Sequence, residues 1–191
     1  MTPGDIHQPI DDERRQVCRM IDRLATDDDL CQRLAKSRGW KKETIKQLAL
    51  EGYLGWHDSK LAFIYDAGVK LRWREKGERV IRWAFGKPWL WRGAYLTIPS
   101  RTKILLCEGE SDVIALLDAG AEDDSARLCI AIPSASTFSD GWASLFDGKD
   151  VTLCFDGDHA GSAAADRVGN VLSSHARTVE MLDWEGIRRA C

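Results

Sequence analysis

Two short acidic clusters in the sequence each follow an apolar run. The first, Glu108-Gly109-Glu110-Ser111-Asp112, comes directly after Ile104–Cys107, and the second, Asp156-Gly157-Asp158-His159-Ala160-Gly161, comes directly after Val151–Phe155. If both runs are strands of one open parallel sheet, the groups just beyond their carboxyl ends share one edge, where such sheets bind ligands. We therefore expect Glu108, Asp156 and Asp158 to converge, although 48 residues separate Glu108 from Asp156.

Carboxylates that are brought together raise one another's pKa unless cations neutralise them. Oxygen-only ligand sets suit Mg²⁺ or Mn²⁺, so Glu108, Asp156 and Asp158 predict a site for one or two such ions. Asp112 falls in the first turn of a following helix, where it either caps that helix or helps to hold the site. One acidic cluster alone is more often a helix cap, but two clusters after two apolar strands favour a metal site.

From Lys103 onward the sequence alternates apolar strands with helices. The expected strands are Lys103–Cys107, Leu128–Ile132, Val151–Phe155 and Thr178–Leu182, and the expected helices are Asp112–Ala119, Ser139–Phe146 and Ala160–Leu172. This order predicts right-handed β-α-β units and a parallel sheet covered by helices on both faces. The fold class expected for this part is therefore α/β, with a Rossmann-like sheet.

The first hundred residues have a different pattern. Residues 1–12 show little periodicity and predict a loose arm. Helices are expected over 12–36 and 42–50, and short strands over 61–65, 69–74 and 79–85. The period and the charge change near residue 100, which predicts three parts: the arm (1–12), a small α+β unit (13–100) and an α/β domain (101–191).

The expected strands of the small unit are strongly basic, which the net charge of −3 for the whole chain conceals. From Gly68 to Arg92 there are eight basic and two acidic side chains. Strand alternation places Lys70, Arg72 and Arg74 on one face. Such a face either tracks a phosphate backbone or simply faces solvent, and charge alone does not decide between the two. The candidate phosphate contacts are Lys70, Arg72, Arg74, Arg82, Lys87 and Arg92.

Composition argues against several classes of protein. None of the six cysteines lies in the paired CxxC spacing of a zinc site, so we expect no zinc and interpret them as buried side chains in a reducing cytoplasm. No apolar run approaches the roughly 20 residues of a membrane span, and the first residues are not a secretory signal. We therefore expect a cytoplasmic protein without a membrane partner. The five tryptophans between Trp56 and Trp91 are either core residues or surfaces for stacking on bases.

At the two acidic motifs the sequence resembles the Toprim superfamily, the domain shared by bacterial-type primases, topoisomerases and some nucleases. Glu108-Gly109-x-x-Asp112 is similar to its first motif, and Asp156-x-Asp158-x-Ala160-Gly161 to its second, within residues 101–183. The resemblance implies catalytic roles for Glu108, Asp112, Asp156 and Asp158, and structural roles for the glycines Gly109 and Gly161. Glu108 is then either a general acid/base or only a metal ligand.

The upstream part is more loosely similar to bacterial and phage primases, through Leu34-x-x-Ser37-Arg38-Gly39, Glu43-Thr44-Ile45 and Gly52-Tyr53. This implies a primase-like core that makes short primers from nucleoside triphosphates on a single-stranded DNA template. The sequence departs from that family in showing neither a zinc-binding domain nor a GxxxxGK[ST] loop, so a zinc-domain protein or a replicative helicase would act in trans.

Three other functions are weighed against a primase. A Toprim nuclease would use the same metals to direct water at a phosphodiester. A non-catalytic module would keep the fold only to bind nucleic acid or a partner. A topoisomerase is disfavoured, because it needs a nucleophilic tyrosine on a separate domain and Tyr53, Tyr65 and Tyr95 all lie in the small unit.

Overall fold

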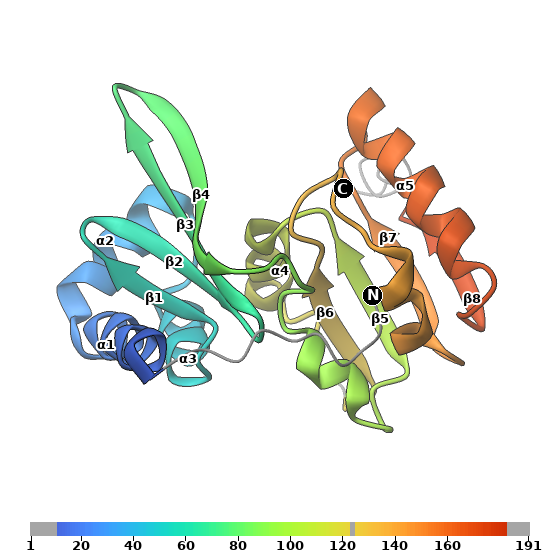
Figure 1. Cartoon of the computed structure of the whole chain (residues 1–191), viewed down its shortest axis with the longest axis horizontal. Coiled ribbons are helices and arrows are strands. Elements are labelled where there is room, and N and C mark those ends of the chain that lie inside the picture. The colour runs from blue at the N-terminus through green and yellow to red at the C-terminus, as the bar shows by residue number, and fades with distance from the viewer. Residues whose placement is uncertain (1–10, 123–124, 183–191) are drawn as a thin grey trace.

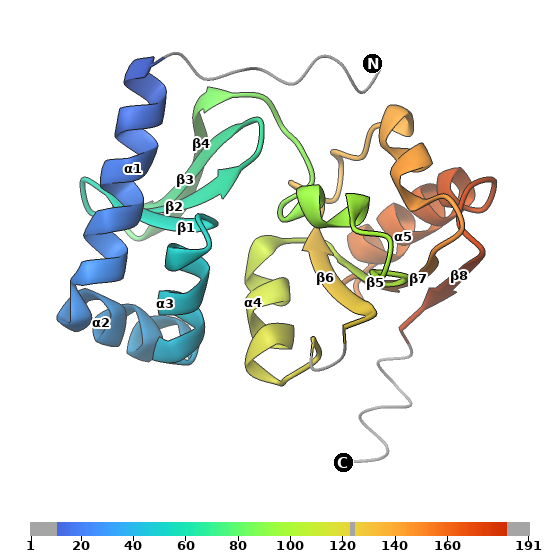
Figure 2. The same ribbon diagram turned by 90° about the horizontal axis from the view of Figure 1, so that it is seen from below.

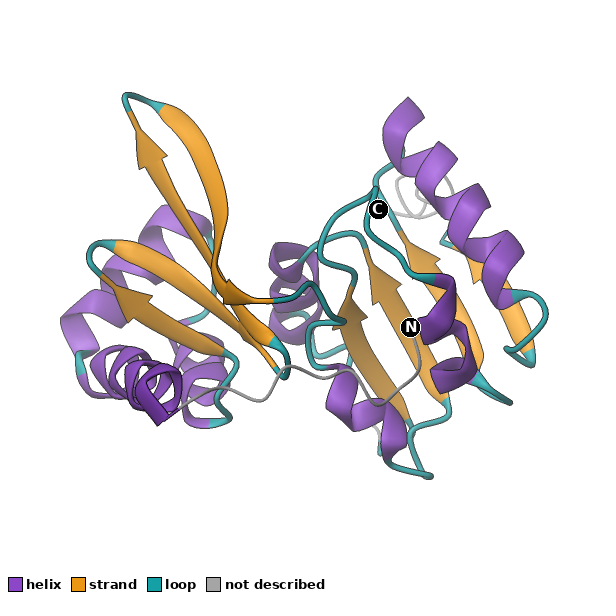
Figure 3. Ribbon diagram, in the orientation of Figure 1, coloured by secondary structure: helices purple, strands orange, loops and turns teal. Residues whose placement is uncertain are grey.

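The structure, a computed structural model, describes residues 11–122 and 125–182. Two units lie side by side (Figures 1 and 3). We call residues 11–86 the N-terminal unit and residues 103–182 the C-terminal unit, and residues 87–102 connect them. Residues 1–10 of the predicted arm lie outside the described part. Residues 11 and 12 are described, and they correct the prediction of a loose arm, because the first helix already begins at Asp11.

Three helices open the N-terminal unit: α1 (Asp11–Thr26), α2 (Asp28–Arg38) and α3 (Lys42–Leu50). The single helical region expected over 12–36 is divided at Asp27, whose side chain accepts a hydrogen bond from the backbone N–H of Leu30 at 2.9 Å. This N-cap starts α2. The helix ends at Gly39, whose φ of +73° is a left-handed conformation that glycine adopts without strain.

A four-stranded antiparallel sheet follows, in the order β1-β2-β3-β4. Its strands are β1 (Leu54–His57), β2 (Lys60–Tyr65), β3 (Gly68–Glu75) and β4 (Glu78–Gly86). The sequence predicts the last three and misses β1. Helix α1 covers the outer face of this sheet, and the other face is turned toward the C-terminal unit (Figure 2). The β3–β4 hairpin extends beyond β2 as a free-standing arm (Figure 1).

The C-terminal unit is a parallel sheet in the order β6-β5-β7-β8 with helices on both faces, as predicted. Its elements, with the turn of 3₁₀ helix that precedes them, are η1 (Gly93–Thr97), β5 (Lys103–Cys107), α4 (Glu110–Asp118), β6 (Arg127–Ala131), η2 (Asp140–Phe146), β7 (Asp150–Cys154), α5 (His159–Leu172) and β8 (Thr178–Met181). Two details differ from prediction: α4 begins at Glu110 rather than Asp112, and residues 140–146 form a 3₁₀ helix. No helix in residues 11–122 or 125–182 is long and apolar enough to span a membrane.

Trp91, in the connecting segment, joins the two units. Its ring is fully buried and meets Tyr53 and Phe63 edge-on, with centroids 6.0 and 5.9 Å away. Its backbone exchanges two hydrogen bonds with Ala131 of β6, at 2.9 and 3.2 Å. The side chain of Trp91 therefore packs in the N-terminal core, while the backbone of the same residue extends the C-terminal sheet.

We expect Trp91→Ala to lower the free energy of unfolding by about 3–5 kcal/mol, because it removes a large buried ring and leaves a cavity between the units. Urea denaturation followed by circular dichroism measures this change. Leu50→Ala is the control, since Leu50 is 77% exposed and should change stability by less than about 0.5 kcal/mol. Equal effects of the two substitutions would show that Trp91 does not carry the contact between the units.

Candidate functional site at the acidic edge of the parallel sheet

Strands β5 and β7 are neighbours, and their last residues, Cys107 and Cys154, are in register. The acidic clusters that follow them therefore emerge at the same edge of the sheet. The backbone N–H of Asp156 donates to Oε2 of Glu108 at 3.4 Å, which ties the two motifs together directly. The structure thus brings Glu108 and Asp156 together, as the strand-end argument predicts.

The second motif folds back on itself at the start of α5. Oδ1 of Asp158 accepts a hydrogen bond from the backbone N–H of Gly161 at 2.8 Å, so Asp158 is the N-cap of this helix. A Cβ on Gly161 would lie 2.2 Å from the carbonyl oxygen of Asp156. Only glycine allows this approach, which explains the glycine of the motif. One oxygen of Asp158 is therefore engaged in capping.

Asp112 lies in the first turn of α4, four residues after Glu108 in the sequence. Burial, then the nearby charge of Asp156, raises the pKa of Asp112 to about 6, while a backbone hydrogen bond from Gly109 acts in the opposite direction. Burial also raises the pKa of Glu108, with smaller contributions from Asp156 and Asp158. These carboxyl groups therefore lie within one another's electrostatic field.

The donor chemistry of this edge fits Mg²⁺ or Mn²⁺. In the part of the chain that the structure describes, no three Asp, Glu, His or Cys side chains already form a cluster that could hold an ion. Glu108, Asp156 and Asp158 nevertheless offer only oxygens, and a divalent cation would relieve the repulsion from Asp156 and Asp158 that adds to the effect of burial on the pKa of Glu108. These three residues are the candidate ligands.

A cleft of about 670 Å³ opens in front of these carboxylates. One side consists of Glu108, Asp112 and Asp156, and the opposite side consists of Arg72, Arg79, Ile81 and Trp83 from the β3–β4 hairpin. The loop after β6 closes it with the hydroxyl groups of Ser134, Ser136 and Thr137. The cleft therefore places guanidinium groups across from carboxylates.

Arg72 connects the hairpin to the acidic edge. Its Nη1 donates to Oγ of Ser111 at 2.7 Å, and its Nε is buried without a hydrogen-bond partner among the described residues. Burial lowers the pKa of Arg72, and the nearby charges of Arg38 and Arg79 lower it further. A group of cations that repel one another and leave a donor unused is suited to bind an anion such as a phosphate.

Two of the predicted basic contacts, Lys70 and Arg92, are buried, whereas the prediction assumed an exposed face. Lys70 is 4% exposed, pairs with Glu110 and donates to the carbonyl of Pro133 at 2.8 Å. Arg92 is 5% exposed, pairs with Glu122 at 2.9 Å and donates to the carbonyl of Cys129 at 2.8 Å. Both charges are therefore engaged in buried ion pairs, although Lys70 still lines the cleft.

The hairpin register divides the other predicted residues between two faces. Arg74 pairs with Arg79 and Arg72 with Ile81, so these share the face that bounds the cleft. Arg82 is opposite Leu71 and lies on the other face, 5.8 Å from the ring of Trp73. Lys87 is exposed beyond the end of β4.

Sequence reasoning missed Arg38, Arg79 and the hydroxyl loop of the cleft. Arg79 was recognisable as basic, and the alternation of β4 around the Lys76-Gly77 turn would have placed it opposite Arg74. Arg38 reaches the same group from the end of α2, which is a tertiary proximity that no local pattern signals.

The comparison with protein families agrees with this geometry. Residues 105–187 match the family model described as Toprim-like. The match covers less than half of the chain, and it supports a relation of this part to the Toprim superfamily. The Toprim-like domain supports a metal-dependent enzyme acting on nucleic acid, since Toprim domains are usually catalytic and typically bind Mg²⁺. No curated protein matches the chain.

The raised pKa of Asp112 predicts how stability depends on pH. The folded protein holds this proton more tightly than the unfolded chain, so stability falls as pH rises from about 4 to about 6. Asp112→Asn should therefore stabilise the metal-free protein at about pH 7.5, with a gain that shrinks toward about pH 4.5. Urea unfolding at both pH values, with exposed Asp140→Asn as control, measures this. If Asp112→Asn lowered the free energy of unfolding by the same amount at both pH values, the charge of Asp112 would not be the cause.

Proposed function

We propose that the chain is a primase-type nucleotidyltransferase core, which makes or extends short primers on single-stranded DNA. The observation that carries this proposal is the cleft itself, in which Glu108 and Asp156 of the Toprim-like domain lie across from Arg72 and Arg79 of the hairpin. A reaction between a nucleoside triphosphate and a primer needs both: carboxylates to hold the ions, and cations to hold the phosphates.

One or two divalent ions at Glu108, Asp156 and Asp158 would supply neutralisation of the triphosphate and activation of the primer 3′-hydroxyl. Arg72 and Arg79 bind the phosphates of the nucleotide, and the bond from Arg72 to Ser111 fixes the first of these guanidinium groups relative to the carboxylates. Arg74, on the same face farther along the arm, contacts the template backbone. Glu108 holds or transfers the proton of the attacking hydroxyl.

The N-terminal unit supports a primase over a nuclease. Its Ser37-Arg38-Gly39 and Gly52-Tyr53 segments carry the primase resemblance, and the structure brings the charge of Arg38 close to that of Arg72. A nuclease would use the same carboxylates, so the two functions differ in product and not in site. A replicative helicase or a zinc-domain protein would supply unwinding and template selection in trans, and we place the reaction in the cytoplasm.

Removing the two motif-two carboxylates should abolish synthesis. We expect Asp156→Asn/Asp158→Asn to reduce product by about 100-fold or more, because the ions lose two ligands, while Asn at position 158 still caps α5. The assay combines single-stranded template, all nucleoside triphosphates and Mg²⁺ or Mn²⁺, and gel electrophoresis resolves product length. Asp140→Asn/Asp166→Asn is the charge-matched control, since both residues are exposed and lie away from the cleft.

The same assay separates the alternatives. Metal-dependent shortening of the template, lost in the double variant, would identify a nuclease. Absence of any product, with template binding unaffected by the substitutions, would rule out both enzymes and leave a binding module.

Arg79→Ala tests the phosphate-binding side of the cleft. We expect weaker template or nucleotide binding, and a slope of log affinity against log salt that is shallower by about 1, because one phosphate contact is lost. Fluorescence anisotropy at several salt concentrations measures both. Arg33→Ala, an exposed arginine of α2 outside the cleft, should change neither the affinity nor the slope.

A further inference from the structure

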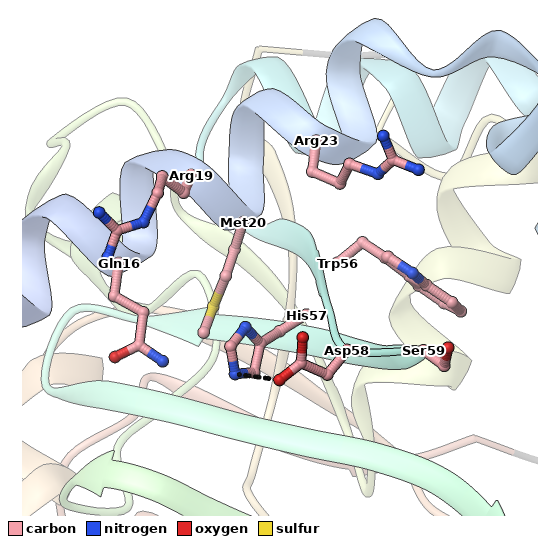
Figure 4. A pocket seen from close by; sticks show the side chains of 8 residues that line it. All are labelled: Gln16, Arg19, Met20, Arg23, Trp56, His57, Asp58 and Ser59. Atoms are coloured by element: carbon pink, nitrogen blue, oxygen red, sulfur yellow. Dashed lines mark ion pairs between the residues drawn. The ribbon is translucent and has the colours of Figure 1, made fainter.

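A second groove lies on the other side of the N-terminal sheet from the cleft. Its volume is about 510 Å³, and it runs between α1 and the turn that joins β1 to β2 (Figure 4). The residues that line it are Gln16, Arg19, Met20 and Arg23 of α1, and Trp56, His57, Asp58 and Ser59 of the strand and turn. The proposed reaction uses none of them.

The fold itself shapes this groove. Met20 is 1% exposed and packs so closely on Gly55 that a Cβ there would lie 2.8 Å from the Cβ of Met20, which brings the helix down on β1. Asp58 and Ser59 both have positive φ, of 44° and 62°, as a tight two-residue hairpin turn requires. The turn therefore lies beside α1 as a fixed wall.

Cations and an indole ring face this groove together. Arg19 and Arg23 are one helical turn apart on α1 and both line the groove, with their guanidinium groups extending in opposite directions (Figure 4). Arg23 pairs with Asp27 at 3.1 Å, and His57 with Asp58 at 3.2 Å. Arg19 has no ion-pair partner within residues 11–122 and 125–182, so its charge is available to a ligand.

The positive surface continues past the turn along the same face of the sheet. Lys60 directly follows Ser59, and its Nζ lies 5.5 Å from the ring centre of Trp73. Arg82 lies over the same ring at 5.8 Å. Trp73 is only partly buried and lies close to both cations, on the face opposite the cleft.

We propose that this outer face, from Arg19 and Arg23 to Trp73, is a second binding site for single-stranded nucleic acid. Guanidinium and ammonium groups hold the phosphates, and unpaired bases stack on Trp73, which gives affinity without sequence preference. An acidic peptide would use the cations and leave the indole unused, and a duplex offers no free base to stack. The site goes beyond the proposed reaction and does not depend on whether the cleft synthesises or cleaves.

The test measures binding of a fluorescent 20-residue oligothymidine to the full chain in EDTA without nucleotides, and it uses the Arg79→Ala background so that binding through the cleft is already weakened. We expect Arg19→Ala/Arg23→Ala to weaken binding about tenfold and to reduce the salt slope by about 2. The matched control is Arg14→Ala/Arg33→Ala, which removes the same charge from two exposed helical positions outside the groove. An equal loss in the control would overturn the proposal.

Trp73 distinguishes stacking from charge. Trp73→Leu should weaken binding at least about fivefold and Trp73→Phe should restore much of it, because a phenyl ring still stacks. Circular dichroism melting of each variant checks folding. If Trp73→Leu binds like the wild type while the arginine pair is impaired, the face is a general anion or acidic-peptide surface and the proposal fails. The Asp156→Asn/Asp158→Asn variant should bind oligothymidine normally, so failure of the proposed reaction and failure of this site are separate results.

Discussion

The geometry of the cleft depends on one buried carboxylate, Glu110. It is the first residue of α4, is 5% exposed and lies within the first motif. Tyr65 of β2 donates a hydrogen bond to it, and Lys70 of β3 forms an ion pair with it. Lys70 also donates to the carbonyl of Pro133, beyond the end of β6. A buried charge that loses its partner is strongly destabilising, so each of these groups fixes the others, and together they anchor the hairpin base to the strand ends.

This anchor divides the hairpin into a fixed part and a free part. Two residues beyond Lys70, Arg72 is still held by Ser111. Two residues farther, Arg74 is exposed and, among the described residues, bonds only to the carbonyl of Gly77 within its own turn, at 2.9 Å. The guanidinium group of Arg72 is therefore positioned in advance, which lowers the entropy lost on binding a phosphate there. The guanidinium groups nearer the tip can adapt to a longer backbone.

The sequence predicted the parts of the site that arise from local pattern and from one topological rule. Apolar runs such as Val151–Phe155 mark buried strands, and parallel strands place the residues just after them at one edge, so the meeting of Glu108 and Asp156 was predictable. The burial of Lys70 and Arg92 was not, because alternation shows that side chains share a face without showing that another unit covers it. Arg72 and Arg82 lie on opposite faces of the hairpin, and this placement depends on the turn after Glu75, which sets the register of β4.

The charge distribution sets the order in which a nucleic acid can reach the cleft. Residues 51–100 carry a net charge of +4 and residues 101–191 a net charge of −8. In the proposed reaction, the carboxylates without ions would repel a phosphate backbone, so the first contacts would fall on the basic N-terminal unit. Divalent ions held by Glu108 and Asp156 would remove this repulsion. The outer face carries no such barrier, so if it binds single strands it does so before and without the metal. One sheet would then retain the template on one face while its other face serves a metal-dependent step.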